Sequence, residues 1–172
     1  DGIACDGFIW KYLWDDLAEQ CDVAHWHYRG HGRSSAPADP AKVDIAQHAR
    51  DLMAVRGHVG DPPCVLLGHS MGGVVVQHLV LAQPDRVSAL VLMDTSPDRV
   101  GVDGELVDLA CEVVSTQGLA ALLEIQRALG SPLDTERGRA LHERPGWREQ
   151  QERKFLRCSP EMYVTMARLL TT

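Results

Sequence analysis

A serine framed by glycines is the feature that most constrains this chain. Residues 65–73 read VLLGHSMGG, in which Ser70 stands two positions from a glycine on each side. The short apolar run at 64–67 predicts a buried strand, and the largely apolar run at 71–83 predicts a helix that is buried all round. A strand that passes directly into a helix is the context in which G-x-S-x-G forms a sharp turn, the nucleophile elbow.

The elbow explains why the serine needs these neighbours. Its backbone lies in a rarely populated region, and residues two positions away pass so close that a Cβ atom would clash. Gly68 and Gly72 supply that clearance. The turn also places Ser70 at the positive end of the next helix, where the N–H of Met71 can face an oxyanion. We therefore interpret Ser70 as a nucleophile; a chance match in a glycine-rich loop is the alternative.

The composition indicates one globular domain with a dispersed acidic surface. The chain has 172 residues, is 45% hydrophobic and carries a formal net charge of -7. This length fits a single domain. No run of like charge suggests a nucleic-acid partner, and no apolar run reaches the ~18 residues that a membrane span needs. We expect neither nucleic acid nor membrane as a partner, and the sequence says nothing about oligomeric state.

The cysteines favour a reducing compartment. Their number is odd, they are widely spaced, and none forms a C-x-x-C pair, so neither a disulfide framework nor a zinc site is predicted. They are Cys5, Cys21, Cys64, Cys111 and Cys158. A cytoplasmic location is the default expectation.

Strand and helix patterns alternate through the first 97 residues. This alternation predicts βαβ crossovers and an α/β fold with a mostly parallel sheet covered by helices on both faces. The predicted elements are a helix over 8–19, a strand over 22–28, a helix over 44–56, strands over 64–67 and 87–94, and the helix after Ser70.

The strand signal disappears after Pro97, and amphipathic helical patterns take its place. Leu109, Val113 and Leu122 belong to these patterns and are expected in a core rather than in a pocket wall. Ser159 followed by Pro160 predicts the start of a further helix. We expect two units, a core over 1–97 and a helical cap over 98–172.

Four stretches of the chain together resemble the α/β-hydrolases of the cap-bearing esterase, lactonase and C–C hydrolase type. They are DGIACDGFIW, YRGHGRSSAP, LLGHSMGG and ALVLMDTSP. The resemblance implies that a serine attacks an ester, lactone or related carbonyl of a small molecule through an acyl-enzyme, without a metal or organic cofactor. Serine rather than aspartate at the elbow disfavours the dehalogenase and epoxide-hydrolase branches.

The resemblance also implies a second oxyanion donor. In this family a loop that begins His-Gly gives the backbone N–H of the next residue to the oxyanion. Asp1-Gly2-Ile3 would occupy that place here, so Ile3 is the expected donor. Asp1 in place of histidine is a departure that affects the packing of the loop.

The general base is the component that the sequence does not provide. A serine hydroxyl becomes a good nucleophile only when a base removes its proton. In α/β-hydrolases the acid and the histidine of the catalytic triad follow the elbow in the sequence, in that order. His78 is expected as a core histidine of the elbow helix and His142 lies in the cap, so neither suits the role. We expect Asp94 to cap a helix rather than to serve as the triad acid.

Both ends of the chain look cut. It begins without methionine and ends within a helical pattern, and the resemblance implies that the acid and the histidine follow Thr172. As given, the chain is then an inactive fragment. The alternative function is a hydrolase-like protein that binds a small ligand without cleaving it.

Other histidines allow a metal-site reading. His25, His27 and His31 form H-x-H-x3-H, a spacing that could bind zinc in a metallo-hydrolase. Arg29 stands where an acidic ligand would be needed, so ordinary packing and hydrogen bonding is favoured. We interpret the loop that contains Arg29, His31 and Arg33 as structural, and His69 as a residue that shapes the turn.

Overall fold

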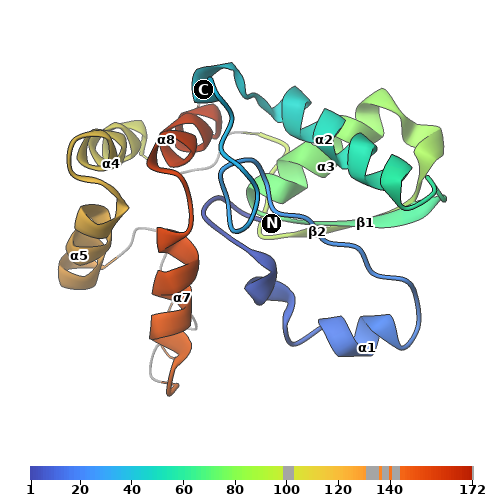
Figure 1. The fold of residues 1–172 in the computed structure, drawn as a ribbon, viewed down its shortest axis with the longest axis horizontal. Coiled ribbons are helices and arrows are strands. Elements are labelled where there is room, and N and C mark those ends of the chain that lie inside the picture. Colours follow the sequence, from blue (N-terminus) through green and yellow to red (C-terminus); the bar gives the residue numbers. More distant parts are fainter. Residues whose placement is uncertain (99–102, 131–135, 137–139, 141–143, 172) are drawn as a thin grey trace.

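The computed structural model describes residues 1–98, 103–130, 136, 140 and 144–171. The chain forms a small parallel sheet with helices on one face and a helical group beside it (Figure 1). No described helix has the length and apolar composition that a membrane crossing requires. The elements in chain order are η1 (Gly7–Trp10), α1 (Trp14–Ala18), η2 (Pro40–Lys42), α2 (Ile45–His58), β1 (Cys64–His69), α3 (Met71–Ala82), η3 (Pro84–Arg86), β2 (Val87–Met93), α4 (Gly104–Gln117), α5 (Leu119–Leu129), α7 (Trp147–Leu156) and α8 (Pro160–Leu169).

The sheet confirms the predicted parallel α/β arrangement. β1 and β2 pair in parallel with Leu66 opposite Leu90, and α3 makes the crossover between them. Helices α2 and α3 lie on one face of the sheet (Figure 1). The prediction of cover on both faces is wrong for the described residues, because Val65, Val91 and Leu92 of the strands remain exposed.

Residues 22–28 do not form the predicted strand. Within the described chain, residues 22–27 make no backbone–backbone hydrogen bond to a neighbouring strand. The β-type composition instead buries side chains, since Tyr28 is only 3% exposed. β-type residues are favoured wherever side chains pack on a half-buried surface. The pattern therefore predicted the burial of this segment correctly, but it could not show whether a neighbouring strand is present to pair with its backbone.

The helix predicted over 8–19 is broken into two short pieces. The chain forms the 3-10 turn η1 and then the five-residue helix α1, which buries no side chain. Tyr12 is 63% exposed, and Leu13 and Leu17 are exposed as well, so the apolar face lacks a described packing partner. A helix this short gains little without tertiary packing, which explains why the amphipathic pattern did not give one continuous helix.

The main core lies between the sheet, α2, α3 and α8. Tyr28, Leu52, Val75, Met162 and Met166 are among its buried side chains. The prediction that α3 is buried all round is wrong, because Leu81 is 86% exposed and only the side of α3 toward α2 and the sheet is covered.

A second cluster holds the cap helices together. Val114, Leu119 and Leu122 are buried in it with Cys158, which confirms the core prediction for Leu122. Leu109 is exposed, and for this residue the prediction is wrong. Ser159 accepts a hydrogen bond from the Met162 N–H at 3.3 Å, which confirms the predicted start of α8.

A buried histidine of α2 should make the fold sensitive to acid. His48 is fully buried with its Nε2 3.0 Å from Met166 Sδ, and burial lowers the pKa of His48 to about 4. Because the unfolded chain takes up this proton at a higher pH, stability should fall as pH drops from about 6.5 toward 4, by about 2 kcal/mol at pH 4.5.

Urea unfolding at pH 6.5 and 4.5, followed by circular dichroism, measures this effect. His48→Leu removes one titrating ring and should reduce the pH dependence, and the remainder is expected from His25, whose pKa burial also lowers to about 4. His58→Gln, at the exposed end of the same helix, should leave it unchanged. An equal loss of stability in wild type and His48→Leu would contradict the assignment.

Candidate active site

The backbone at Ser70 has the predicted strand–turn–helix form. β1 ends at His69, α3 begins at Met71, and Ser70 between them has φ 53° and ψ -125°. A residue with a side chain rarely adopts this conformation, and it persists only where the surroundings enforce it. Ser70 N–H donates to Met93 O at 2.9 Å, so β2 helps to hold the turn.

The glycines around the serine are required by close packing. A Cβ at Gly68 would lie 2.7 Å from the carbonyl oxygen of Gly72 and 2.6 Å from Val76 Cγ2. A Cβ at Gly72 would lie 2.5 Å from Asp1 O. These contacts agree with the clearance predicted for both positions.

A third glycine of the elbow was not predicted from the sequence. A Cβ at Gly73 would lie 2.3 Å from Thr95 Cγ2, so α3 also packs closely on the chain that follows β2. In the sequence, the only sign of this close contact is that Gly73 directly follows Gly72. The sequence does not show that the contact partner is Thr95.

The loop Asp1-Gly2-Ile3 lies against the elbow. A methyl group at Gly2 would lie 3.2 Å from Ser70 Cβ and 3.4 Å from Ser70 Oγ. Among the described residues, the N–H groups of Ile3 and Met71 donate to no backbone acceptor. The loop and the start of α3 thus lie beside the serine, and the role of the Ile3 and Met71 N–H groups as oxyanion donors stays a prediction.

The unusual Asp1 is held by two buried contacts that sequence reasoning missed. Its Oδ1 accepts from Trp10 Nε1–H at 2.6 Å, and its Oδ2 lies 2.6 Å from His25 Nε2. The carboxylate is only 1% exposed. A buried carboxylate with two donors is fixed in place, so this network positions the loop on which Ile3 lies.

His69, the residue before Ser70, contacts Asp94 and Trp10. Its Nε2 is 3.7 Å from the Asp94 carboxylate, its ring meets Trp10 edge-on at 6.4 Å, and its buried Nδ1 has no partner among the described residues. Burial lowers the pKa of His69, whereas the Asp94 carboxylate raises it. The neutral ring is therefore favoured.

Asp94 does not have the predicted capping role. It follows β2 with φ 47°, and its side chain is 87% exposed and faces His69. The next described helix, α4, is capped by Asp103, whose side chain accepts from the Glu105 N–H.

The two histidines that follow the elbow in the sequence are His78 and His142. His78 is exposed on α3, so the prediction of a core histidine is wrong. His142 lies outside the described residues. Among the described residues, no group is hydrogen-bonded to Ser70 Oγ.

The histidines before the elbow make protein contacts. His27 Nδ1 accepts from the Arg33 N–H at 3.2 Å, and burial lowers the pKa of His27. His31 Nδ1 lies 3.0 Å from Arg29 O, and its Nε2 is 3.4 Å from Cys158 Sγ. In the described part of the chain, no three His, Cys, Asp or Glu side chains are grouped as metal ligands.

The arginine of the loop after residue 28 has a structural partner. Arg29 Nε and Nη2 donate to the two carboxylate oxygens of Asp51 on α2, at 2.6 and 2.7 Å. This two-point ion pair joins the loop to α2 and accords with the structural role expected for the loop.

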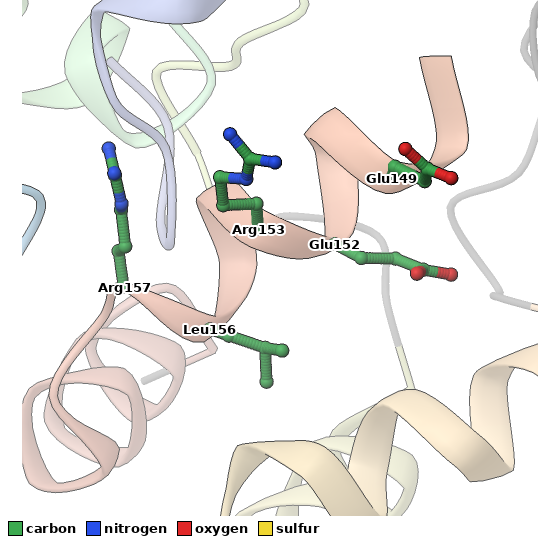
Figure 2. A pocket seen from close by; sticks show the side chains of 5 residues that line it. All are labelled: Glu149, Glu152, Arg153, Leu156 and Arg157. Carbon is green, nitrogen blue, oxygen red and sulfur yellow. The ribbon is translucent and has the colours of Figure 1, made fainter. Parts of the chain in front are cut away.

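A shallow depression of about 450 Å³ lies on α7. Figure 2 shows Arg153 and Arg157 pointing to one side of the helix and Glu149 and Glu152 to another. The side chains that line it are Glu149, Glu152, Arg153, Leu156 and Arg157. Ser70 is not among the lining residues.

Comparison with known proteins identifies the fold family. Residues 2–110, more than half of the chain, match the family described as alpha/beta hydrolase fold. The chain is 42% identical over 106 residues to the lipase LipV of Mycobacterium tuberculosis, covering 62% of this chain and 38% of the lipase. It is 30% identical over 116 residues to 3-oxoadipate enol-lactonase 2 of Acinetobacter baylyi, covering 67% of this chain and 42% of the lactonase.

Solved structures show the same fold. A carboxylesterase structure from Nitrososphaera gargenis superposes with a TM-score of 0.81 at 24% identity, covering 99% of this chain and 61% of that one. An esterase from Exiguobacterium antarcticum has a TM-score of 0.75 at 22% identity and covers 100% and 64%. The chain thus spans less than half the length of the two curated relatives and less than two thirds of these structures. Its elbow, parallel strands and sequence agree with these matches, and the chain belongs to the α/β-hydrolase fold family.

Proposed function

We propose that this chain carries the nucleophile and the oxyanion donors of a serine hydrolase. The observation that supports it best is the backbone of Ser70, held at φ 53° at the start of α3 with Gly2 packed beside its hydroxyl. Such strain is retained where it serves a site. The substrate would be a carboxylic ester, a lactone or a related carbonyl compound.

The proposed reaction uses the groups gathered at the elbow. Ser70 Oγ forms a bond to the carbonyl carbon while its proton passes to a general base, and the N–H groups of Met71 and Ile3 bind the resulting oxyanion. When the tetrahedral intermediate collapses, the bond to the leaving oxygen breaks, the base returns its proton to that oxygen, and an acyl-enzyme forms that water then hydrolyses. The acid and the histidine are proposed to lie outside residues 1–172, which leaves this chain with little turnover by itself.

The proposed organisation follows from this assignment. Residues 1–97 would form the part of the core that carries the elbow, and residues 98–172 the helical cap over it. A small molecule would be the partner, and a cytoplasmic location stays a prediction.

A second candidate is a hydrolase-like protein that binds a small ligand without cleaving it. The observation in its favour is that no described group hydrogen-bonds Ser70 Oγ. A serine without a base can bind a carbonyl compound at the oxyanion donors and leave it intact.

Diethyl p-nitrophenyl phosphate tests the nucleophile directly. Attack by Ser70 Oγ would form a Ser–O–P bond and release p-nitrophenolate, so peptide mass spectrometry should locate one diethylphosphoryl group on Ser70. Labelling should be slow and should accelerate with pH, because solvent hydroxide must remove the hydroxyl proton. Ser88→Ala, an exposed serine of β2, should label like wild type. Labelling spread over several serines, or absent at Ser70, would overturn the proposal.

A further inference from the structure

The first loop of the chain passes from one hydrophobic cluster to the other between Ile3 and Ala4. Ile3 packs partly buried against the main core, whereas Ala4, only 3% exposed, belongs to the cap cluster. Ala4 has φ 51°, a value that a residue with a Cβ atom rarely adopts. Such a conformation persists only where the surrounding packing enforces it. The packing of the cap therefore acts on the residue that directly follows the proposed donor Ile3.

The partners of Ala4 come from three parts of the cap. They are Val114 of α4, Leu119 and Leu122 of α5, and Cys158 between α7 and α8. The Ala4 backbone also forms a hydrogen bond with the Cys158 thiol. Because close-packed groups transmit displacements to one another, a shift of the cap helices would displace Ala4.

Two polar contacts attach the following residues to the same side of the cap. The Asp6 carboxylate lies 3.8 Å from Arg157 Nη1 at the end of α7. Further along, Lys11 Nζ donates to Gln150 Oε1 of α7 at 3.3 Å. The segment that begins at Ala4 is thus joined to the cap at three points, and the first of them adjoins the proposed donor.

The other end of the loop and the second donor are held by the core. The buried Asp1 carboxylate accepts from Trp10 and pairs with His25. Met71 begins α3, and its side chain is buried in the main core. Ile3 therefore lies between an anchor in the core and an anchor in the cap, whereas Met71 is held by the core. A change in cap packing should act on one donor and spare the other.

We propose that the cap positions the oxyanion donor Ile3 through Ala4, so that cap packing sets how well one of the two donors binds the oxyanion at Ser70. This inference rests on the proposed function and assigns Ala4 as a positioning residue. Oxyanion donors stabilise the transition state because they are fixed in place before the charge develops. A loosened cap should therefore slow attack by Ser70 without altering the serine.

The diethylphosphoryl adduct of Ser70 reports on the two donors separately. Its phosphoryl oxygen takes the place of the oxyanion and can accept from both N–H groups. Because hydrogen bonding deshields an amide proton, the signals of Ile3 and Met71 should both move downfield when the adduct forms. Two-dimensional NMR of the isotope-labelled chain measures each signal, after mass spectrometry has located the label.

Ala4→Gly breaks the link to the cap with little damage to the fold. It removes the methyl group buried in the cap cluster, but glycine adopts the positive φ readily, so the two effects on stability should nearly cancel. We expect the Ile3 signal of the adduct to lose its downfield shift and the Met71 signal to keep it. Labelling of Ser70 should slow by about tenfold, less than the roughly 10²–10³-fold that loss of a whole donor costs.

Ala49→Gly is the matched control for this variant. Ala49 is a buried alanine of α2 in the main core, so the same methyl group is removed from a place that does not adjoin Ile3. Both donor signals should stay shifted in this variant, and labelling should proceed at the wild-type rate.

A pair of leucine variants repeats the comparison with larger cavities. Leu122 of α5 and Leu52 of α2 are 5% and 3% exposed, and both should lose stability when replaced by alanine. Leu122→Ala should reduce the downfield shift of Ile3, whereas Leu52→Ala should preserve it. A merely structural role of the cap would affect the donor equally in the two variants.

The outcomes separate this inference from the proposed function. Wild-type protein that carries the label on Ser70 but shows no shift of Ile3 overturns the inference alone. So does a shift of Ile3 that survives Ala4→Gly, or a loss that includes Met71. Absence of the label from wild-type Ser70 overturns the proposed function, and this inference falls with it.

Discussion

Replacing Gly68 by alanine should destabilise the fold by about 3 kcal/mol, a large effect for one methyl group. The added carbon would lie 2.7 Å from Gly72 O and 2.7 Å from Gly73 Cα, and both are backbone atoms. A flexible side chain could move aside, but these atoms belong to the first turn of α3. The strand and the helix must therefore separate, which also loosens the turn that holds Ser70.

Gly57→Ala is the matched control for this substitution. Gly57 lies within α2, and a Cβ there would meet no atom within 4 Å. Alanine restricts the unfolded chain and favours the helix, so this variant should gain about 0.5–1 kcal/mol. Urea unfolding followed by circular dichroism measures both variants. Equal stability of Gly68→Ala and wild type would show that the elbow is not packed as described.

The elbow could be predicted from the sequence because its causes are local. A β-type run, a serine between glycines and a helical run are all found within residues 64–83. The strand at 22–28 failed because a strand is defined by its neighbour, and no ladder forms with that segment in the described chain. The helix at 8–19 failed for the same reason, since an amphipathic pattern indicates a face without naming what covers it.

The surroundings of the serine were less predictable because they depend on contacts between distant segments. The Asp1 carboxylate is held by Trp10 and His25, which are nine and 24 positions away. Asp94 was expected to cap a helix, yet its carboxylate faces His69 because the turn after β2 brings it there. Periodicity places each residue on an element, and only the packed fold shows which of them meet.

Ser70→Ala should lower the turnover of p-nitrophenyl butyrate by about 1,000-fold or more in a protein that joins this chain to its general base. The substitution removes the only atom proposed to bond to the acyl carbon, while α3 and the donors at Met71 and Ile3 remain. Residual activity would then reflect binding and oxyanion stabilisation alone.

A control substitution at a second serine distinguishes a loss of catalysis from a loss of folded protein. Ser88 is exposed on β2, and Ser88→Ala should retain full turnover and stability. Ser70→Ala should retain stability but lose the burst of p-nitrophenolate that marks acyl-enzyme formation, because no hydroxyl remains to accept the acyl group. Rapid turnover by residues 1–172 alone, abolished by Ser70→Ala, would instead place the base among these residues. Unchanged turnover in Ser70→Ala would remove the serine from the mechanism.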